Sequence, residues 1–300
     1  MEQLTYIRMS DGHELFVRSY EPATTCRGHV HILHGMAEHS GRYDKFARFL
    51  QQQGYYVTLH DHRGHGQTAA RNGKYGYFGA EAGFHRVVID AHEVIEAVRK
   101  GKDLPQVQLI GHSMGSFIAR RYVQRYQVAT VILMGTGEGT LLHKAGQIIP
   151  TLSAVKDEPN PLLDKLSFGS FNRTVSKPAT DYDWLCANPQ AVQQYIADEQ
   201  CGFIATTQFY ADIMEGIVLV STPSQIAHIP KTLPILIISG SEDPVGAMTN
   251  GVFAVAEQFN KAGVENVCTY IVEGKRHEIL NEVNYLTTYH VILRWLQEHE

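Results

Sequence analysis

The sequence is poor in the features that mark several classes of protein. Its four cysteines are scattered without a Cys-x-x-Cys pair, so we expect reduced thiols rather than a disulfide framework or a zinc site. No apolar run approaches the ~18 residues that a membrane-spanning helix needs, and the first residues carry an acid and no apolar signal core. The net charge of −5 is opposite in sign to that of a nucleic-acid-binding surface. We therefore expect a cytoplasmic protein with no nucleic-acid partner.

What the 300 residues do contain is an alternation of strands and helices. A hairpin is predicted around the turn pair Asp11-Gly12. After it, short apolar runs predict strands, and apolar residues at helical spacing predict helices between them. The predicted strands cover 29–33, 55–60, 107–110, 130–134, 233–239 and 266–272, and the predicted helices cover 43–50, 87–98, 116–126, 252–259 and 279–298. This order is typical of an α/β fold, in which a mostly parallel central sheet carries helices on both faces.

The alternation stops after Gly135, and residues 137–226 contain no convincing central strand. Prolines divide this stretch into short helices and loops. Apolar residues fall on one helical face over 141–152 and again over 203–217. We therefore expect residues 137–226 to form a helical cap, inserted into a core made of residues 1–136 and 227–300.

The most informative motif is Gly-His-Ser-Met-Gly at residues 111–115, between a predicted strand and a predicted helix. In that context G-x-S-x-G is typical of a nucleophile elbow, a sharp turn that lifts a serine hydroxyl clear of the sheet. Glycines suit positions 111 and 115 because a Cβ there would crowd the neighbouring strand or helix. Ser113 is the predicted nucleophile, at a helix N-terminus whose free N–H groups can face a developing oxyanion.

A serine hydroxyl needs a base to accept its proton, and that base needs an orienting carboxylate. Asp243 follows the predicted strand 233–239, and His277 follows the predicted strand 266–272, so acid and base arrive in the order used by α/β-hydrolases. Glu242 is the alternative acid, although Asp before Pro244 suits the turn and has the shorter reach. The sequence therefore predicts a Ser113, His277 and Asp243 triad that requires no metal and no cofactor.

Acyl transfer also requires N–H donors for the oxyanion. The first predicted donor is the backbone N–H of Met114, the residue after the nucleophile. The second is that of Met36, in the turn His34-Gly35-Met36, although this stretch can also be interpreted as a simple turn. His112 is expected to point away from the nucleophile. The loop Asp61–Gly66 is predicted to be structural, with Arg63 and His65 hydrogen-bonded to neighbouring loops.

Five motifs, taken together and in order, resemble the monoacylglycerol lipase and lysophospholipase family of the α/β-hydrolase fold. They are His34–Tyr43, Asp61–Gly66, Gly111–Gly115, Ser239–Gly246 and Arg276–Glu278. In the predicted cap, Asp183-Trp184-Leu185 and Cys201-Gly202-Phe203 look like bacterial lysophospholipases. The chain departs from the family at Ser116, where another glycine is usual, and at Gln67-Thr68, where serine is commoner. Neither departure touches a predicted catalytic residue.

The resemblance implies a carboxylic-ester hydrolase that acts on a lipid with one acyl chain and a polar head, a monoacylglycerol or a lysophospholipid. The apolar stripes of the predicted cap favour a channel for the acyl chain, although they fit plain core packing equally well. Transient contact of the cap with a membrane surface stays open, and no obligatory protein partner is expected.

Two alternatives remain from the sequence. A short-chain carboxylesterase or a prolyl-type aminopeptidase has the same frame, and the peptidase needs acids to hold the substrate amine. The predicted cap offers as candidates Asp157, Glu158, Asp181, Asp183, Asp198 and Glu199. A non-catalytic binding protein on a hydrolase fold is the other, and it is disfavoured because all three triad members are present.

Overall fold

The computed structural model describes residues 2–139 and 156–300 of the chain. The apolar stripe predicted over 141–152 lies outside these described residues. Within the part that the structure describes, no helix is long and apolar enough to cross a membrane.

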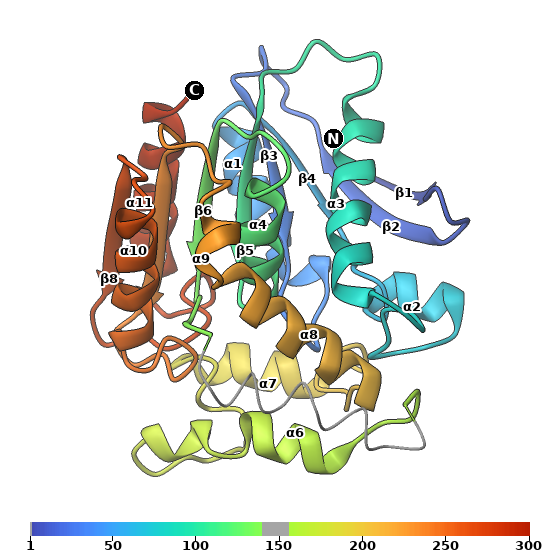
Figure 1. Ribbon diagram of the computed structural model, residues 1–300, viewed down its shortest axis with the longest axis vertical. Coiled ribbons are helices and arrows are strands. Elements are labelled where there is room, and N and C mark those ends of the chain that lie inside the picture. The colour runs from blue at the N-terminus through green and yellow to red at the C-terminus, as the bar shows by residue number, and fades with distance from the viewer. Residues whose placement is uncertain (1, 140–155) are drawn as a thin grey trace.

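Eight strands form one sheet in the order β1-β2-β4-β3-β5-β6-β7-β8 (Figure 1). The predicted hairpin forms the antiparallel edge, where β1 pairs with β2 and β2 with β4, and all the other pairings are parallel. Interior strands are buried along their whole length because helices cover both faces. The strands are Glu2–Arg8, Glu14–Tyr20, Gly28–Leu33, Tyr55–His60, Val107–His112, Thr130–Met134, Ile235–Gly240 and Val267–Val272, which are β1 to β8.

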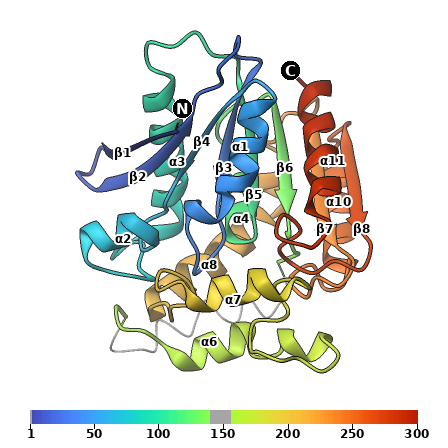
Figure 2. The ribbon, with the colours of Figure 1, turned by 180° about the vertical axis from the view of Figure 1, so that it is seen from behind.

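Two apolar layers hold the helices on the sheet. Helices α3 (Gly83–Arg99), α4 (Met114–Val123) and α10 (Asn250–Lys261) pack on one face. Helices α1 (Asp44–Gln52) and α11 (Tyr285–Glu298) pack on the other, as the two opposite views show (Figures 1 and 2). The short α2 (Gly66–Asn72) contacts β2. The predicted α/β-hydrolase fold, a mostly parallel sheet with helices on both faces, is confirmed.

Between β6 and β7 the described chain forms only helices and loops. The α-helices are α6 (Pro161–Phe168), α7 (Pro189–Ala197), α8 (Thr207–Val220) and α9 (Pro223–Ile226), and a 3-10 helix covers Phe171–Thr174. Asparagine or threonine side chains cap the first turns of α6, α7 and α8, which explains why each begins where it does. Figures 1 and 2 show α6 and α7 below the end of the sheet to which the arrowheads of β6 and β8 point. The segment therefore covers the carboxyl ends of the parallel strands, where sites form in α/β folds.

Some helix assignments differ from the structure. The helix after the elbow ends at Val123 rather than Tyr126, and α2 occurs in a stretch for which no helix was predicted. The last helix begins at Tyr285 rather than Ile279, because residues before it are used as a hydrogen-bonded loop. In that loop Glu282 accepts hydrogen bonds from the backbone N–H groups of Ala187 and Arg276, at 3.1 and 3.0 Å. Apolar periodicity alone cannot reveal such a use of polar groups.

Candidate active site

The predicted elbow lies between β5 and α4, and Ser113 is its turning residue. Ser113 has φ 53° and ψ −120°, a conformation that residues with a Cβ rarely adopt. A Cβ at Gly111 would collide with the carbonyl of Gly115, and one at Gly115 would collide with the carbonyl of Leu33. The two glycines therefore let strand, turn and helix approach closely enough to hold Ser113 in this strained geometry.

Asp243 and His277 come together at the ends of the neighbouring strands β7 and β8. His277 Nδ1 lies 3.0 Å from each carboxylate oxygen of Asp243. Asp243 is fully buried and also accepts hydrogen bonds from the Val245 N–H at 2.9 Å and the Ser239 hydroxyl at 3.0 Å. Burial pushes the pKa of Asp243 upward, but these partners and His277 hold that pKa below its usual value. An ionised Asp243 keeps the proton of the neutral imidazole on Nδ1, which leaves Nε2 free to accept one.

Glu242, the alternative acid, points elsewhere. Its side chain is half exposed, and its carboxylate lies 3.9 Å from Arg276 Nε. A glutamate one residue along the turn therefore contributes a surface ion pair, whereas Asp243 faces the imidazole.

The segment His34–Tyr43, here called the oxyanion loop, passes directly beside the elbow. A Cβ at Gly35 would lie 3.2 Å from Ser113 Cβ, so Met36 follows a residue in contact with the predicted nucleophile. Glu38 Oε1 accepts a hydrogen bond of 2.6 Å from the Gly35 N–H, which fixes the start of the loop. Met114 is the first residue of α4, where backbone N–H groups have no acceptor within the helix.

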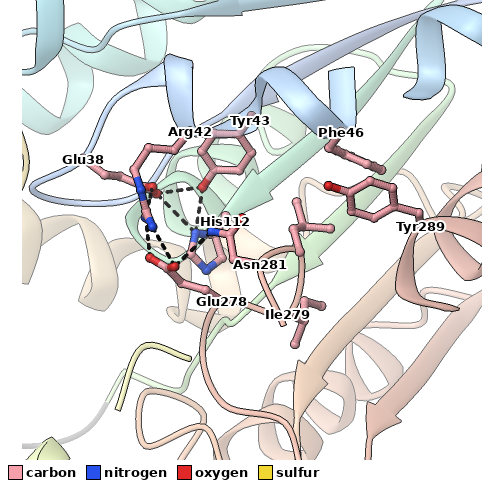
Figure 3. A pocket seen from close by; sticks show the side chains of 10 residues that line it. Glu38, Arg42, Tyr43, Phe46, His112, Glu278, Ile279, Asn281 and Tyr289 are labelled. Atoms are coloured by element: carbon pink, nitrogen blue, oxygen red, sulfur yellow. Dashed lines mark hydrogen bonds and ion pairs between the residues drawn. The ribbon is translucent and has the colours of Figure 1, made fainter. Parts of the chain in front are cut away.

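A buried charge cluster joins the oxyanion loop to the loop that carries His277 (Figure 3). Arg42 donates to Glu38 Oε2 at 2.9 Å and to Glu278 Oε2 at 2.8 Å, and also pairs with Glu278 Oε1. Burial alone would raise the pKa of the Glu38 and Glu278 carboxyl groups. The hydrogen bond from His112 to Glu38, and the positive charge of Arg42 beside both carboxylates, outweigh burial and lower both pKa values. In the sequence, Glu38, Arg42 and Glu278 stand out only as members of two motifs, and no pattern there indicates that the three side chains face one another.

His112 belongs to the charge cluster, and its contacts leave the expectation that it points away from Ser113 as a prediction. Its Nδ1 lies 2.8 Å from Tyr43 Oη and 3.3 Å from Glu38 Oε1, and its Nε2 lies 3.3 Å from the carbonyl oxygen of His277. Burial lowers the pKa of His112, but the Glu38 carboxylate outweighs burial and raises it.

Trp184, from the helical segment, forms the apolar wall of the site. Its ring centroid lies 5.3 Å from that of His277, and it packs against Phe168 and Phe171. Sequence reasoning noted Trp184 only as part of a resemblance, because nothing in a single sequence tells which cap residue faces the imidazole.

The loop Asp61–Gly66 is hydrogen-bonded to the oxyanion loop. Asp61 accepts hydrogen bonds from the N–H groups of Ser40 and Gln67, at 2.8 and 2.7 Å, and so ties itself to the oxyanion loop. Arg63 pairs with Asp90 of α3 and with Asp11 of the hairpin, as predicted. His65 instead bonds, among the described residues, to the carbonyl of Arg63 in its own loop.

One group of side chains among the described residues has metal-like spacing. His39, Asp198 and Cys201 offer ligand atoms that lie within 4.8 Å of one another. However, His39 Nδ1 accepts a hydrogen bond from the Gly41 N–H, so its proton is on Nε2, which donates to Asp198 at 2.9 Å. Burial also raises the pKa of the Cys201 thiol. The spacing of His39 and Asp198 is therefore explained by the hydrogen bond between them.

Comparison with known proteins gives a consistent result. A model of the family described as Serine aminopeptidase, S33, matches residues 24–284. Monoglyceride lipase of Homo sapiens is 25% identical over 99% of this chain and 91% of its own length. Monoacylglycerol lipase of Mycolicibacterium smegmatis is 26% identical over 93% of this chain and 91% of its own. A thermostable carboxyl esterase from Bacillus coagulans superposes with a TM-score of 0.93 at 26% identity, over 99% of this chain and 98% of the esterase.

Proposed function

The chain belongs to the family described as Serine aminopeptidase, S33, and we propose that it is a serine carboxylic-ester hydrolase acting on single-acyl-chain lipids, monoacylglycerols or lysophospholipids. The observation that carries the proposal is the contact of His277 Nδ1 with both oxygens of the buried Asp243, beside an elbow that holds Ser113 in a strained turn. The monoglyceride and monoacylglycerol lipases among its relatives support the substrate class.

In the proposed reaction, Ser113 Oγ attacks the ester carbonyl while His277 Nε2 accepts the hydroxyl proton. Asp243 stabilises the imidazolium that forms and holds the ring in orientation. The same Nε2 proton then passes to the leaving alcohol, a glycerol or a glycerophospho group. Water attacks the acyl-enzyme with His277 again as base, and the fatty acid leaves with Ser113 restored.

The oxyanion of both tetrahedral intermediates is assigned to the N–H groups of Met36 and Met114. Each such donor stabilises the transition state by about 3 kcal/mol when it is aimed where the charge develops. The Glu38 contact with the Gly35 N–H and the helix start at Met114 support this assignment, because both constrain the backbone around the donors.

Residues 137–226 are proposed to act as the cap that shields the reaction and receives the acyl chain. Trp184 gives the imidazole an apolar aromatic neighbour, and an apolar cluster extends from it through Leu185 and Val192 to Val245 of the core. An apolar wall with a few fixed polar groups is typical of pockets for lipid-like ligands.

A prolyl-type aminopeptidase would need free acids in the cap, and three of the candidate acids are already engaged. Asp157 pairs with Lys74, Asp198 with His39, and Asp183 accepts from the N–H of Ala179. Glu158, Asp181 and Glu199 are exposed. Only these three exposed acids are therefore left as candidates to hold a substrate amine. The substrate panel tests the aminopeptidase with an aminoacyl amide and the short-chain carboxylesterase with esters of rising chain length.

The test is a panel of p-nitrophenyl esters of rising chain length, monoacylglycerols, lysophospholipids and an aminoacyl amide. Native protein is expected to cleave at least one single-chain lipid ester, and Ser113→Ala none, because no other group in the proposal forms the acyl-enzyme. Cleavage of the amide alone, or equal rates from the two proteins, would refute the proposal.

The proposal also places the enzyme in the cytoplasm, with its cap in transient contact with lipid surfaces. Leu162 and Leu166, one turn apart on α6, are 67% and 63% exposed. Co-sedimentation with phosphatidylcholine vesicles is expected, and it should weaken when both leucines are replaced by serine. Unchanged sedimentation would exclude α6 as the contact.

A further inference from the structure

The cap segment Tyr195–Gly202, here called the clasp, touches the oxyanion loop at two places. The carbonyl oxygen of Ala37 accepts hydrogen bonds from Tyr195 Oη at 3.0 Å and from the Gly202 N–H at 2.9 Å. Two residues further along the oxyanion loop, His39 Nε2 donates to Asp198 at 2.9 Å. The Tyr195 ring also lies under the Arg42 guanidinium, 4.9 Å away. A cap element is therefore bonded to the residues on the C-terminal side of Met36.

Ala37 is held in a conformation that it would not choose. Its φ is +52°, in the left-handed region, and its side chain is buried. A non-glycine residue is strained there, and the conformation persists only where surrounding contacts hold it. The two hydrogen bonds to the Ala37 carbonyl are contacts of that kind.

Met36 lies between two fixed points of the loop. On one side the Gly35 N–H is bonded to Glu38 of the same loop, which His112 at the end of β5 links to the core. On the other side the Ala37 carbonyl is bonded to the clasp. The orientation of the Met36 N–H is therefore set jointly by a core contact and a cap contact. The Tyr195 side chain is buried, so bulk water cannot replace the hydrogen bond between its hydroxyl and the Ala37 carbonyl if that bond is lost.

We propose that Tyr195 is a positioning residue, whose hydroxyl holds the Ala37 carbonyl so that the Met36 N–H is aimed at the oxyanion. The inference rests on the proposed function, in which Met36 is an oxyanion donor. Its consequence is that the cap acts on the chemical step as well as on access, because a cap that moves away releases the strained loop.

The experiment compares Tyr195→Phe with Tyr210→Phe on the best ester of the panel. Tyr210 is the matched control: it is a buried cap tyrosine whose hydroxyl donates to Asp164 of α6, within the cap, at 2.9 Å. For Tyr195→Phe we expect kcat to fall roughly tenfold with KM changed less than twofold, the signature of a lost transition-state contact. For Tyr210→Phe we expect kcat and KM close to native values.

Two further readouts separate positioning from mere stability. The inhibition constant of a boronic acid transition-state analogue should weaken in Tyr195→Phe by about the same factor as kcat/KM falls. Adding Ala37→Gly should restore most of the lost rate, because glycine adopts a positive φ without penalty. Urea unfolding should show similar losses of stability for the two tyrosine variants.

Native kcat in Tyr195→Phe would overturn the inference while leaving the proposed function intact. A rate loss that Ala37→Gly does not restore, or an equal loss in Tyr210→Phe, would also overturn it, because the hydroxyl would then act on substrate or on the cap as a whole. Native protein without ester hydrolysis would overturn the proposed function, and the inference with it.

Discussion

Ser113 and Ala37 have φ angles of 53° and 52°, which side chains with a Cβ disfavour, and both lie in the candidate active site. Such strain costs on the order of 1–3 kcal/mol a residue and is kept where geometry serves chemistry. The first is held by close glycine contacts, and the second by hydrogen bonds from the cap. At the scale of single residues, the site is therefore built by fixing the backbone as much as by choosing side chains.

The role of Asp243 gives a prediction at this scale. Asp243→Asn is expected to lower kcat by about 10⁴-fold with little change in KM, because an amide can present its N–H to Nδ1 and stabilise the wrong imidazole tautomer. Steady-state kinetics on the best ester of the panel measures it. Glu242→Gln is the neighbouring control and should keep native rates. A large loss in the control with none in Asp243→Asn would transfer the role to Glu242.

At the scale of elements, strands β3 and β4 carry a group of buried histidines that are hydrogen-bonded across the two strands. His31 lies 2.8 Å from the Thr58 hydroxyl through Nδ1 and 3.0 Å from His60 Nδ1 through Nε2, and His29 meets the same hydroxyl at 2.8 Å. The rings of His34, His62 and His65 continue the group beyond the strand ends. The sequence predicted both strands correctly, but not these contacts, because they depend on the cross-strand register of His31 with Thr58.

These six buried histidines predict acid sensitivity. Burial lowers the pKa of His29, His60 and His65 to about 3 and that of His34 to about 4, and lowers those of His31 and His62 well below the usual value. Between about pH 6.5 and 4 the unfolded chain binds protons that the folded chain cannot, so stability falls as pH falls. Each group contributes up to about 1.4 kcal/mol per pH unit. Urea unfolding at several pH values should show a steep loss, and an unfolding free energy that stays flat would contradict it.

Asp212 works in the opposite direction and provides the control. Burial raises its pKa from the usual 3.8 to about 7, against the contacts with Gln208 and Gly83, so between these two pH values the folded state holds a proton that the unfolded state has released. The contribution of Asp212 to the free energy of unfolding is therefore largest below pH 3.8 and is lost as the pH rises from 3.8 to about 7. One carboxyl cannot offset six imidazoles, and Asp212→Asn should make the acid loss steeper.

The sequence predicted the features that depend on local patterns, and it did not predict those that depend on contacts between residues far apart in the chain. The strands, the elbow and the loops carrying Asp243 and His277 depend on local patterns and were all predicted. The start of α11 at Tyr285 was not, because Glu282 is used by distant N–H groups. Of the helices between β6 and β7, α8 at Thr207–Val220 agrees with the apolar stripe predicted over 203–217. The shorter helices α6, α7 and α9 were not predicted individually, because short segments divided by prolines fit several arrangements until the surface that they cover is known.

At the scale of the whole molecule, α8 joins the cap to the core by packing on α3. A Cβ at Gly216 would overlap the ring of Phe84, and one at Gly83 would overlap the carboxylate of Asp212. Each helix thus supplies one glycine to make room for a side chain of the other. Arg120, fully buried on α4, adds hydrogen bonds to the carbonyl of Gly137 and the hydroxyl of Ser221, at 2.9 and 3.2 Å, where the chain leaves and rejoins the core.

The close approach of α8 and α3 predicts the effect of Gly216→Ala. Alanine normally favours a helix over glycine by up to about 1 kcal/mol, yet here overpacking against Phe84 should destabilise the fold by about 1–3 kcal/mol. Urea unfolding measures the change. Glu215→Ala, at the exposed neighbouring position, should be nearly neutral, and adding Phe84→Leu should recover part of the loss. A more stable Gly216→Ala variant would contradict the packing argument.

The helical insertion leaves the core after β6 and returns before β7, and these two strands pair directly with each other. Because β6 and β7 are hydrogen-bonded to each other, the pairing of the sheet does not depend on the length of the segment inserted between them. A change in the length or sequence of the segment between β6 and β7 is therefore expected to leave the strand ends that carry Ser113, Asp243 and His277 in place. The constraint on any such change is local: the new segment must again supply a donor for the carbonyl of residue 37.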